Sequence, residues 1–148
     1  MGKIVLFEKQ HADILIKDGL NDKLMDLDAT FTESRICDFS KEGQAFTYIH
    51  DGKPIFACGI VQLWDGVAEA WVLGGRHIFD VKILAARTIK KLQRQTCRRY
   101  NIKRLQTSVK ADFVRGIRFA TWCGFKIEGL KKKYGPDGSD YYQLGLIN

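Results

Sequence analysis

The chain has 148 residues, of which 45% are hydrophobic and 28% are charged, and this balance excludes a disordered or fibrous protein. We expect residues 1–148 to form one compact domain with its own core. Lys and Arg outnumber Asp and Glu by 24 to 17, and the net charge of +7 favours an anionic partner without identifying it.

Two further features bear on the compartment and on metal binding. No apolar run approaches the ~20 residues that span a bilayer, and the N-terminus has no signal-peptide pattern, so we expect a cytoplasmic protein. The cysteines are widely spaced, at Cys37, Cys58, Cys97 and Cys123. No nearby His completes a metal-ligand pattern, so we expect no metal site and reduced, mostly buried thiols.

The N-terminal part of the chain predicts a short strand and two helices. The strand is expected at residues 4–7, and apolar residues then recur at helical spacing at Ile16, Leu20, Leu24 and Leu27. Thr30-Phe31-Thr32-Glu33 matches a capping box, in which side chains satisfy the free N–H groups of a helix start. A second helix therefore begins there and ends at Gly43.

The middle of the chain predicts a three-stranded antiparallel meander. Strand-like runs at Ala45–His50, 55–64 and 67–73 are separated by Asp51-Gly52 and Asp65-Gly66. We expect type I′ turns at both dipeptides, because these turns need positive φ and Asp-Gly adopts it at little cost.

The C-terminal part predicts two helices and three strands. A helix should run towards Tyr100 with an apolar row of Phe79, Ile83, Ala86, Ile89 and Leu92. It leads by a right-handed crossover to a parallel strand at 102–109. Asp112 is expected to cap a further helix that Gly124 closes, with Phe113, Ile117 and Ala120 inward. Strands at 126–134 and 140–146 complete the chain.

The motif at the end of the second of these helices points to a family. The helix ends in Trp122-Cys123-Gly124-Phe125, and Lys126-Ile127-Glu128-Gly129 and the turn Tyr134-Gly135-Pro136-Asp137-Gly138 follow. This order resembles the C-terminal half of the GCN5-related N-acetyltransferases, the GNAT superfamily. The resemblance implies an α/β (α+β) fold with a mixed central sheet, in the order β-α-α-β-β-β-α-β-α-β-β. It also implies acetyl-coenzyme A (acetyl-CoA) as co-substrate and an amine acceptor, either a small molecule or a protein.

The resemblance places the co-substrate where the strand ending at Leu73 and the strand starting at Ile102 splay apart. The pantetheine arm then pairs with free backbone groups, and the pyrophosphate meets the N-terminus of the next helix. The residues expected to bind the co-substrate are Val72, Leu73, Gly74, Gly75, Lys82, Ala85, Arg115 and Arg118. A solvated basic face is the alternative interpretation of Arg115 and Arg118.

The phosphate loop departs from the family pattern of Gln/Arg-x-x-Gly-x-Gly/Ala. Counting from Glu69 sets Lys82-Ile83-Leu84-Ala85 against the end of that loop, so Ile83 stands where glycine lets backbone approach phosphate. Ile83 is alternatively a core residue of an amphipathic helix. A shift of a few residues would give Gly74-Gly75 the phosphate-binding role instead.

The resemblance also implies the catalytic groups. Val67-Ala68-Glu69-Ala70-Trp71-Val72 resembles the strand that carries a glutamate general base, and Glu69 falls on it. The alternative for Glu69 is a surface salt bridge. The usual Tyr acid is replaced by Ala120, and the other candidate phenols are Tyr134, Tyr141 and Tyr142.

Two rival functions remain open. The altered loop and Ala120 fit a non-catalytic scaffold, and the Glu69 to Trp71 strand loosely resembles small GNAT-like proteins of tailed bacteriophages, which implies a virion or host protein as partner. A nucleic-acid-binding module is the second rival, because basic residues form a stripe on the long helix at Arg87, Lys91, Arg94 and Arg98. Such a stripe is more often simply the solvent-exposed face of an amphipathic helix. His11, His50 and His77 have no nucleophile motif, so a hydrolytic triad is not expected.

Overall fold

The computed structural model describes residues 2–18 and 44–148. Its strands form one seven-stranded sheet in the order β1-β2-β3-β4-β5-β7-β6. They are β1 (Gly2–Leu6), β2 (Ala45–His50), β3 (Lys53–Trp64), β4 (Val67–Gly74), β5 (Arg104–Lys110), β6 (Lys126–Lys131) and β7 (Tyr141–Ile147). The helices are α1 (Lys9–Lys17), the 3-10 helix η1 (Arg76–Val81), α4 (Lys82–Arg99) and α5 (Val114–Trp122).

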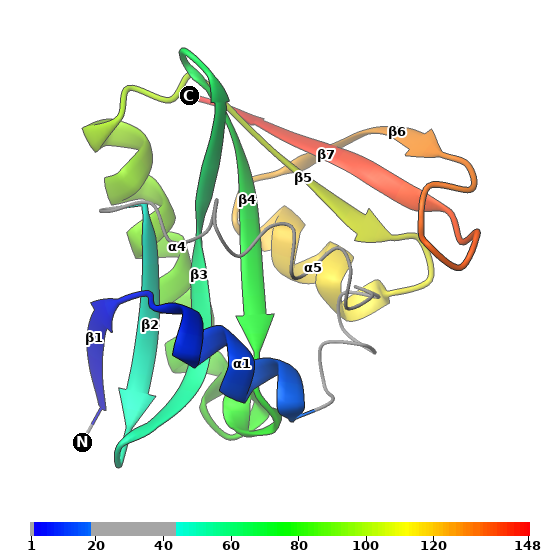
Figure 1. Cartoon of the computed structure of the whole chain (residues 1–148). Helices are drawn as coiled ribbons and strands as arrows, with labels where there is room; N and C mark the ends of the chain where they lie inside the picture. The colour runs from blue at the N-terminus through cyan, green and yellow to red at the C-terminus, as the bar shows by residue number, and fades with distance from the viewer. Residues whose placement is uncertain (1, 19–43) are drawn as a thin grey trace.

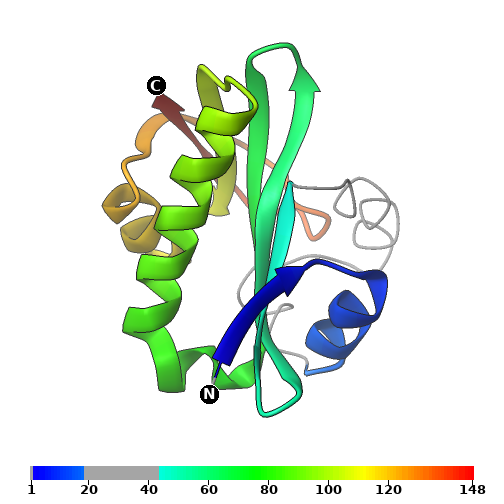
Figure 2. The ribbon, with the colours of Figure 1, turned by 90° about the vertical axis from the view of Figure 1, so that its left-hand side faces the viewer.

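The helices cover the two faces of the sheet unequally. Helices α4 and α5 pack on one face and α1 packs on the other, as the side view in Figure 2 shows. Neighbouring strands are antiparallel except β4 and β5, which are joined by the α4 crossover. The expected mixed α/β fold is confirmed, and the predicted second helix and most of the predicted first helix lie outside the described residues.

The predicted meander is confirmed, but only one of its two turns has the expected type. Asp51 and Gly52 both have positive φ, at 51° and 75°, as a type I′ turn requires. At the second turn only Gly66 is positive, at 80°, so the type I′ expectation for Asp65-Gly66 is wrong. A register shift between Gln62 and Trp64 changes the geometry of the strand ends that this turn joins.

The apolar row predicted for the long helix is wrong at its beginning. Phe79 lies in η1 and is 41% exposed, and Ile83 is 64% exposed. The buried side chains of α4 include Ala85 and Ile89. A 3-10 helix has three residues per turn rather than 3.6, so the row that η1 starts does not continue in phase into α4. Ile83 is therefore not a core residue.

Helix α5 begins one residue later than expected and without the predicted cap. Its N-cap is Phe113, which makes no side-chain hydrogen bond to the helix, so the expectation for Asp112 is wrong. The backbone N–H of Val114 donates to the Asp112 carbonyl in a tight turn at 3.1 Å, so the chain is already bending at Asp112. Gly124 follows the helix with φ of 108°, as the predicted C-terminal glycine should.

The core consists of three clusters that follow the layers. Phe7, Leu15 and Trp71 belong to the cluster beneath α1, where the Phe7 and Trp71 ring centroids are 5.1 Å apart, edge to face. The other clusters lie on the opposite face, one around α5 and one around the first half of α4. Cys58, Cys97 and Cys123 are buried and free, which confirms the expectation for these thiols. No helix in the described segments is long and apolar enough to cross a membrane.

Candidate functional site

The parallel strands β4 and β5 pair over only three residues and then diverge. Their register runs from Val67 with Arg104 to Glu69 with Gln106 and stops there. Figure 1 shows β5 and β7 fanning away from β4 below this point. The Thr107 hydroxyl donates to the Ala70 carbonyl oxygen across the opening at 3.2 Å, where the next backbone rung would stand. The sheet is therefore splayed at the place that the sequence predicts.

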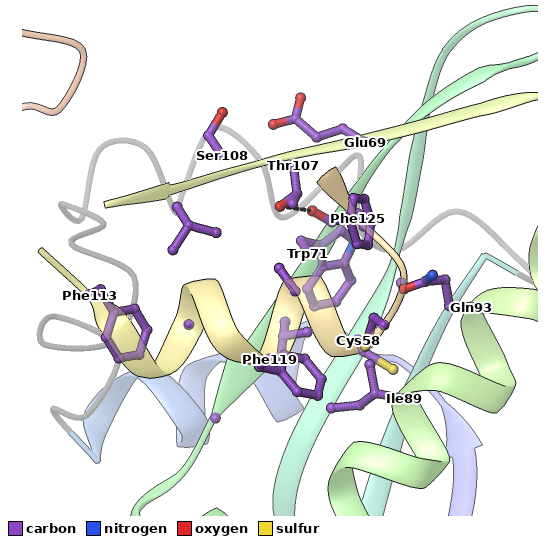
Figure 3. A pocket seen from close by; sticks show the side chains of 18 of the residues that line it. Cys58, Glu69, Trp71, Ile89, Gln93, Thr107, Ser108, Phe113, Phe119 and Phe125 are labelled. Carbon is purple, nitrogen blue, oxygen red and sulfur yellow. Dashed lines mark hydrogen bonds between the residues drawn. The ribbon is translucent and has the colours of Figure 1, made fainter. Parts of the chain in front are cut away.

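A cleft of about 1000 Å³ occupies this opening. It is lined by residues of β3, β4, η1, α4, β5 and α5, together with Tyr134, Gly135, Pro136 and Tyr141 of the β6–β7 segment. Figure 3 shows its interior, where Ile89 and Phe119 are apolar neighbours of Cys58. A mostly apolar cavity of this size with a few polar groups is typical of a small-molecule site.

Two cations stand on the lining of the cleft near its α4 end. Lys82 is the first residue of α4, and Arg115 lies in the first turn of α5. The Arg115 guanidinium carbon lies 5.5 Å from the centre of the Phe79 ring, which links α5 to η1. Neither cation makes an ion pair within the described part of the chain, so both are available to an anionic ligand.

Glu69 lies at the last paired position of β4 and lines the same cleft. Its side chain is half-buried and forms no salt bridge with any described residue. Figure 3 shows its carboxylate beside the opening between β4 and β5, on the side to which Ser108 also points. Because neighbouring side chains of β4 alternate between faces, Glu69 shares the α1 face of the sheet with Trp71.

The other residues predicted to bind the co-substrate are divided between the cleft and its surroundings. Val72, Gly74 and Ala85 line the cleft, as do Lys82 and Arg115. The Leu73 side chain is fully buried in the cluster beneath α1, on the other face of the sheet. The Gly75 N–H donates to the Ile55 carbonyl at 2.9 Å, and neither Gly75 nor Arg118 lines the cleft.

The structure adds polar and thiol groups that sequence reasoning missed. Thr107 and Ser108 of β5 and Gln93 and Thr96 of α4 line the cleft. Each stands among other polar residues in the sequence, so no pattern distinguishes it there. Cys58 and Cys123 also line it. Burial raises the pKa of the Cys58 thiol to about 12 and that of Cys123 to about 11. Both thiols are therefore protonated at neutral pH and are poor nucleophiles.

The family's tyrosine position is occupied here by Ala120 of α5. This side chain is 7% exposed and lines the cleft. Tyr134 and Tyr141 reach the cleft from the last hairpin, as the sequence allowed, and their rings meet edge to face at 5.3 Å. Tyr142 packs instead against the cluster around α5. Within the described residues no group of His, Cys, Asp and Glu could hold a metal ion.

Comparisons with known proteins extend this geometry. No family model and no curated protein matches the chain. Among solved structures, Ard1 from Thermoplasma volcanium is similar, with a TM-score of 0.78 and 15% identity over 99% of this chain and 97% of that one. An acetyltransferase of the GNAT family from Streptococcus pneumoniae gives 0.72 and 14%, covering 99% of both chains.

A spermidine N-acetyltransferase chimera from Vibrio cholerae gives a TM-score of 0.72 and 14% identity, covering 99% of this chain and 95% of that one. At these identities the similarity is one of fold. The similarity includes the strands on both sides of the splay, because the alignments cover nearly the whole chain. The chain therefore has the fold of the GNAT superfamily.

Proposed function

We propose that the protein is an N-acetyltransferase that transfers the acetyl group of acetyl-CoA to a primary amine by direct attack. One observation carries the proposal, namely that the β4–β5 pairing stops at Glu69 above a cleft of about 1000 Å³. Beyond that point the edge of β4 that faces β5 pairs with no strand of the described residues. An extended amide chain such as pantetheine can pair with such an edge.

The charges of the cleft fit the remainder of the donor. Lys82 and Arg115 supply positive charge on the lining, where a pyrophosphate or a 3′-phosphate would gain charge-assisted hydrogen bonds. The altered loop is compatible with this arrangement, because the exposed Ile83 side chain does not line the cleft. The acceptor amine would enter from the α1 face, where Glu69 lies.

Glu69 is the proposed general base. It would take the proton of the attacking ammonium group directly or through one water, and the free amine would then attack the thioester carbonyl. The C–N bond forms and the C–S bond breaks, and the thiolate of coenzyme A leaves with the bonding electron pair. The nitrogen then loses a second proton, which the thiolate takes up, so that the products are the amide and the free thiol. A thiol with a pKa near ~8.5 is a fair leaving group, so the reaction tolerates Ala120 in place of the phenol.

Titration calorimetry with acetyl-CoA tests the donor site. We expect micromolar binding to the protein, and the Lys82→Glu variant should weaken it by roughly tenfold or more through loss of a phosphate contact and gain of repulsion. Lys126→Glu is the matched control, since Lys126 is exposed on the edge strand β6 and does not line the cleft. Its affinity should equal that of the unchanged protein.

A different result would favour the scaffold interpretation. If millimolar acetyl-CoA gives neither heat nor a thermal shift, the fold has been kept without its co-substrate, as in a morphogenesis or host-interaction protein. If the ligand binds but no amine from a panel of polyamines, aminoglycosides and peptides accepts acetyl, the proposed transfer is wrong. Spermidine is a sensible first acceptor, since one of the similar structures is a spermidine N-acetyltransferase.

A further inference from the structure

Helix α4 carries only one sign of charge. Its 18 residues contain no Asp or Glu, but they include Lys82, Arg87, Lys90, Lys91, Arg94, Arg98 and Arg99. A solvated helix face normally mixes both signs, because acidic and basic residues four apart stabilise each other. Here Arg87 and Lys91, Lys90 and Arg94, and Arg94 and Arg98 are like charges four apart, and each pair is destabilising.

No carboxylate relieves this repulsion within the described residues. The side chains of Arg87, Lys90, Lys91, Arg94 and Arg98 form no salt bridge there, whereas Arg104, farther along the same basic stretch, forms a bidentate pair with Glu128 at 2.6 and 3.0 Å. The positive field of Lys90 and Arg94 reaches α5, where it opposes the rise in the pKa of Cys123 that burial causes. The helix face is therefore an uncompensated positive surface.

This surface forms a groove with an aromatic wall. Arg87, Lys90, Lys91, Arg94, Gln95, Arg98 and Trp122 line a depression of about 310 Å³, here called the basic groove. Trp122 ends α5 and is 48% exposed. The Lys90 ammonium lies 4.3 Å from the Trp122 ring centre and donates to the Trp122 carbonyl at 3.1 Å, which fixes α5 beside α4. None of these residues lines the acetyl-CoA cleft.

The dimensions of the groove match a short stretch of a nucleic-acid strand. From Arg87 to Arg98 the helix rises about 16 Å at ~1.5 Å per residue. At the ~3.4 Å axial rise per nucleotide of a strand stacked as in a duplex, that length corresponds to about five phosphates. Arg87, Lys91, Arg94 and Arg98 recur along this line, so about four phosphates can each meet a cation.

We propose that the basic groove binds a single strand of nucleic acid, with phosphates on the arginine and lysine side chains and a base stacked on the exposed part of Trp122. The indole distinguishes this partner from an acidic protein, because a π-face beside a cationic track is what a base and its phosphate require together. The arginines add planar, bidentate donors for phosphate oxygens. The site is separate from the cleft and does not depend on the acetyltransferase proposal.

Fluorescence anisotropy with a labelled oligonucleotide, about ten nucleotides long and of mixed sequence, tests the proposal on the full chain. The logarithm of the binding constant should fall linearly with the logarithm of salt concentration, with a slope near −3 for about four neutralised phosphates on a single strand. Binding should also quench the indole fluorescence of the protein, and the Trp122→Leu variant should lose that quenching.

Variants then locate the site. Lys91→Glu with Arg94→Glu should abolish binding at moderate salt, and Trp122→Leu should weaken it roughly tenfold through the lost stack. Lys126→Glu with Lys132→Glu makes the same change of charge on exposed residues of β6 and the turn after it, and this variant should bind like the unchanged protein. Circular dichroism confirms that each variant is folded.

Three results would overturn the proposal. The first is no binding at low salt, and the second is an equal loss of binding in Lys126→Glu with Lys132→Glu. The third is competition by polyglutamate as strong as that by the oligonucleotide, with the affinity of Trp122→Leu unchanged. The last result would assign the groove to an acidic protein surface instead.

Discussion

At the residue scale, the position of Glu69 brings a carboxylate to the lining of the cleft. A glutamate on a strand usually points into solvent or pairs with a cation. Glu69 instead occupies the last residue position at which β4 pairs with β5. Its carboxylate is therefore at the edge of the opening without an ion-pair partner among the described residues. In the proposed reaction this carboxylate faces a ligand in the cleft.

Replacing Glu69 with Gln should separate binding from chemistry. The amide keeps the size of the side chain but cannot take a proton, so the transfer rate should fall by about 10²-fold or more while acetyl-CoA affinity stays unchanged. Steady-state rates with calorimetry on the same preparations measure both. Asp65→Asn, on the exposed turn before β4, is the matched control and should keep full activity. Equal rates for Glu69→Gln and the unchanged protein would exclude Glu69 as the base.

A second residue-scale feature is the contact of Arg104 with Glu128, which joins β5 to β6 across β7. The guanidinium donates to both carboxylate oxygens, and the hydrogen bonds lower the pKa of Glu128. Gly145 of β7 lies beneath the carboxylate, where a Cβ would meet Glu128 Oε1 at 2.6 Å. Because Gly145 has no side chain, β7 leaves room for Arg104 and Glu128 to meet above it.

This pair predicts a pH dependence of stability with a definite sign. Because the folded-state pKa of Glu128 is lowered, its contribution is complete above the ordinary carboxyl range and is lost as pH falls through the lowered value. The urea midpoint of Glu128→Gln should lie below that of the unchanged protein at about pH 7, and the gap should narrow at about pH 2.5. The exposure of the pair makes the effect small. A gap that widens in acid would contradict the assignment.

At the element scale, the sequence predicted elements whose signals are local. Asp51-Gly52 fixes a hairpin because two adjacent residues need positive φ, and the structure has both. The phase of α4 was mispredicted because η1 inserts a different period before it, and nothing in Arg76–Val81 marks a 3-10 helix in a single sequence. Capping at Asp112 failed for a similar reason, since the tight turn before α5 displaces the helix start by one residue.

The candidate site was predictable where it lies on regular strands and helices. Glu69 and Val72 line the cleft because β4 begins at Val67, as the sequence predicts, and Lys82 lines it although η1 precedes α4. Arg118 does not, because one turn of α5 separates it from Arg115 on the helix surface. The far wall of the cleft, which includes Gln93 and Phe125, joins segments that meet only after the sheet has formed. No spacing along the chain reveals such a wall.

The β2–β3 contact sets a sharp element-scale prediction. A Cβ on Gly59 would lie 2.4 Å from the Gln44 carbonyl oxygen and 2.8 Å from the Ala45 Cα, both backbone atoms that cannot rotate away. Gly59→Ala should therefore cost about 1–3 kcal/mol of unfolding free energy, as overpacking usually does. Gly129→Ala is the matched control, because a Cβ there meets nothing within 4 Å. Urea unfolding of both variants measures the difference, and equal midpoints would refute the close approach.

At the scale of the whole molecule, the sheet is two smaller sheets joined by a short seam. Strands β1 to β4 pair continuously, as do β5 to β7, but the two sets share only the rungs from Val67 to Glu69. The cluster around α5 bridges the seam, since it contains Ile60 and Ala68 from one set and Leu105 and Leu144 from the other. Just past the last paired residues, the Thr107 hydroxyl donates a hydrogen bond to the Ala70 carbonyl oxygen and so links the two sets.

A ligand in the opening should therefore tighten the molecule across the seam. If acetyl-CoA pairs with the edge of β4 that faces β5 and contacts β5 or α5, opening of the seam must first release the ligand, so amide exchange on both flanks slows together. At a hundredfold excess over its dissociation constant, bound ligand would protect these amides by up to about 2.7 kcal/mol.

Hydrogen exchange read by mass spectrometry should show slower exchange in residues 70–74 and 107–110 on adding acetyl-CoA, with β1 and β2 unchanged. Lys82→Glu at the same ligand concentration should lose about half of this protection or more, because the phosphates are then held less tightly. Protection of one flank alone would mean that the ligand lies against that strand without bridging the seam. Equal protection of β1 and β2 as well would show that the ligand stabilises the whole molecule from a site elsewhere. That result would exclude the opening between β4 and β5 as the acetyl-CoA site.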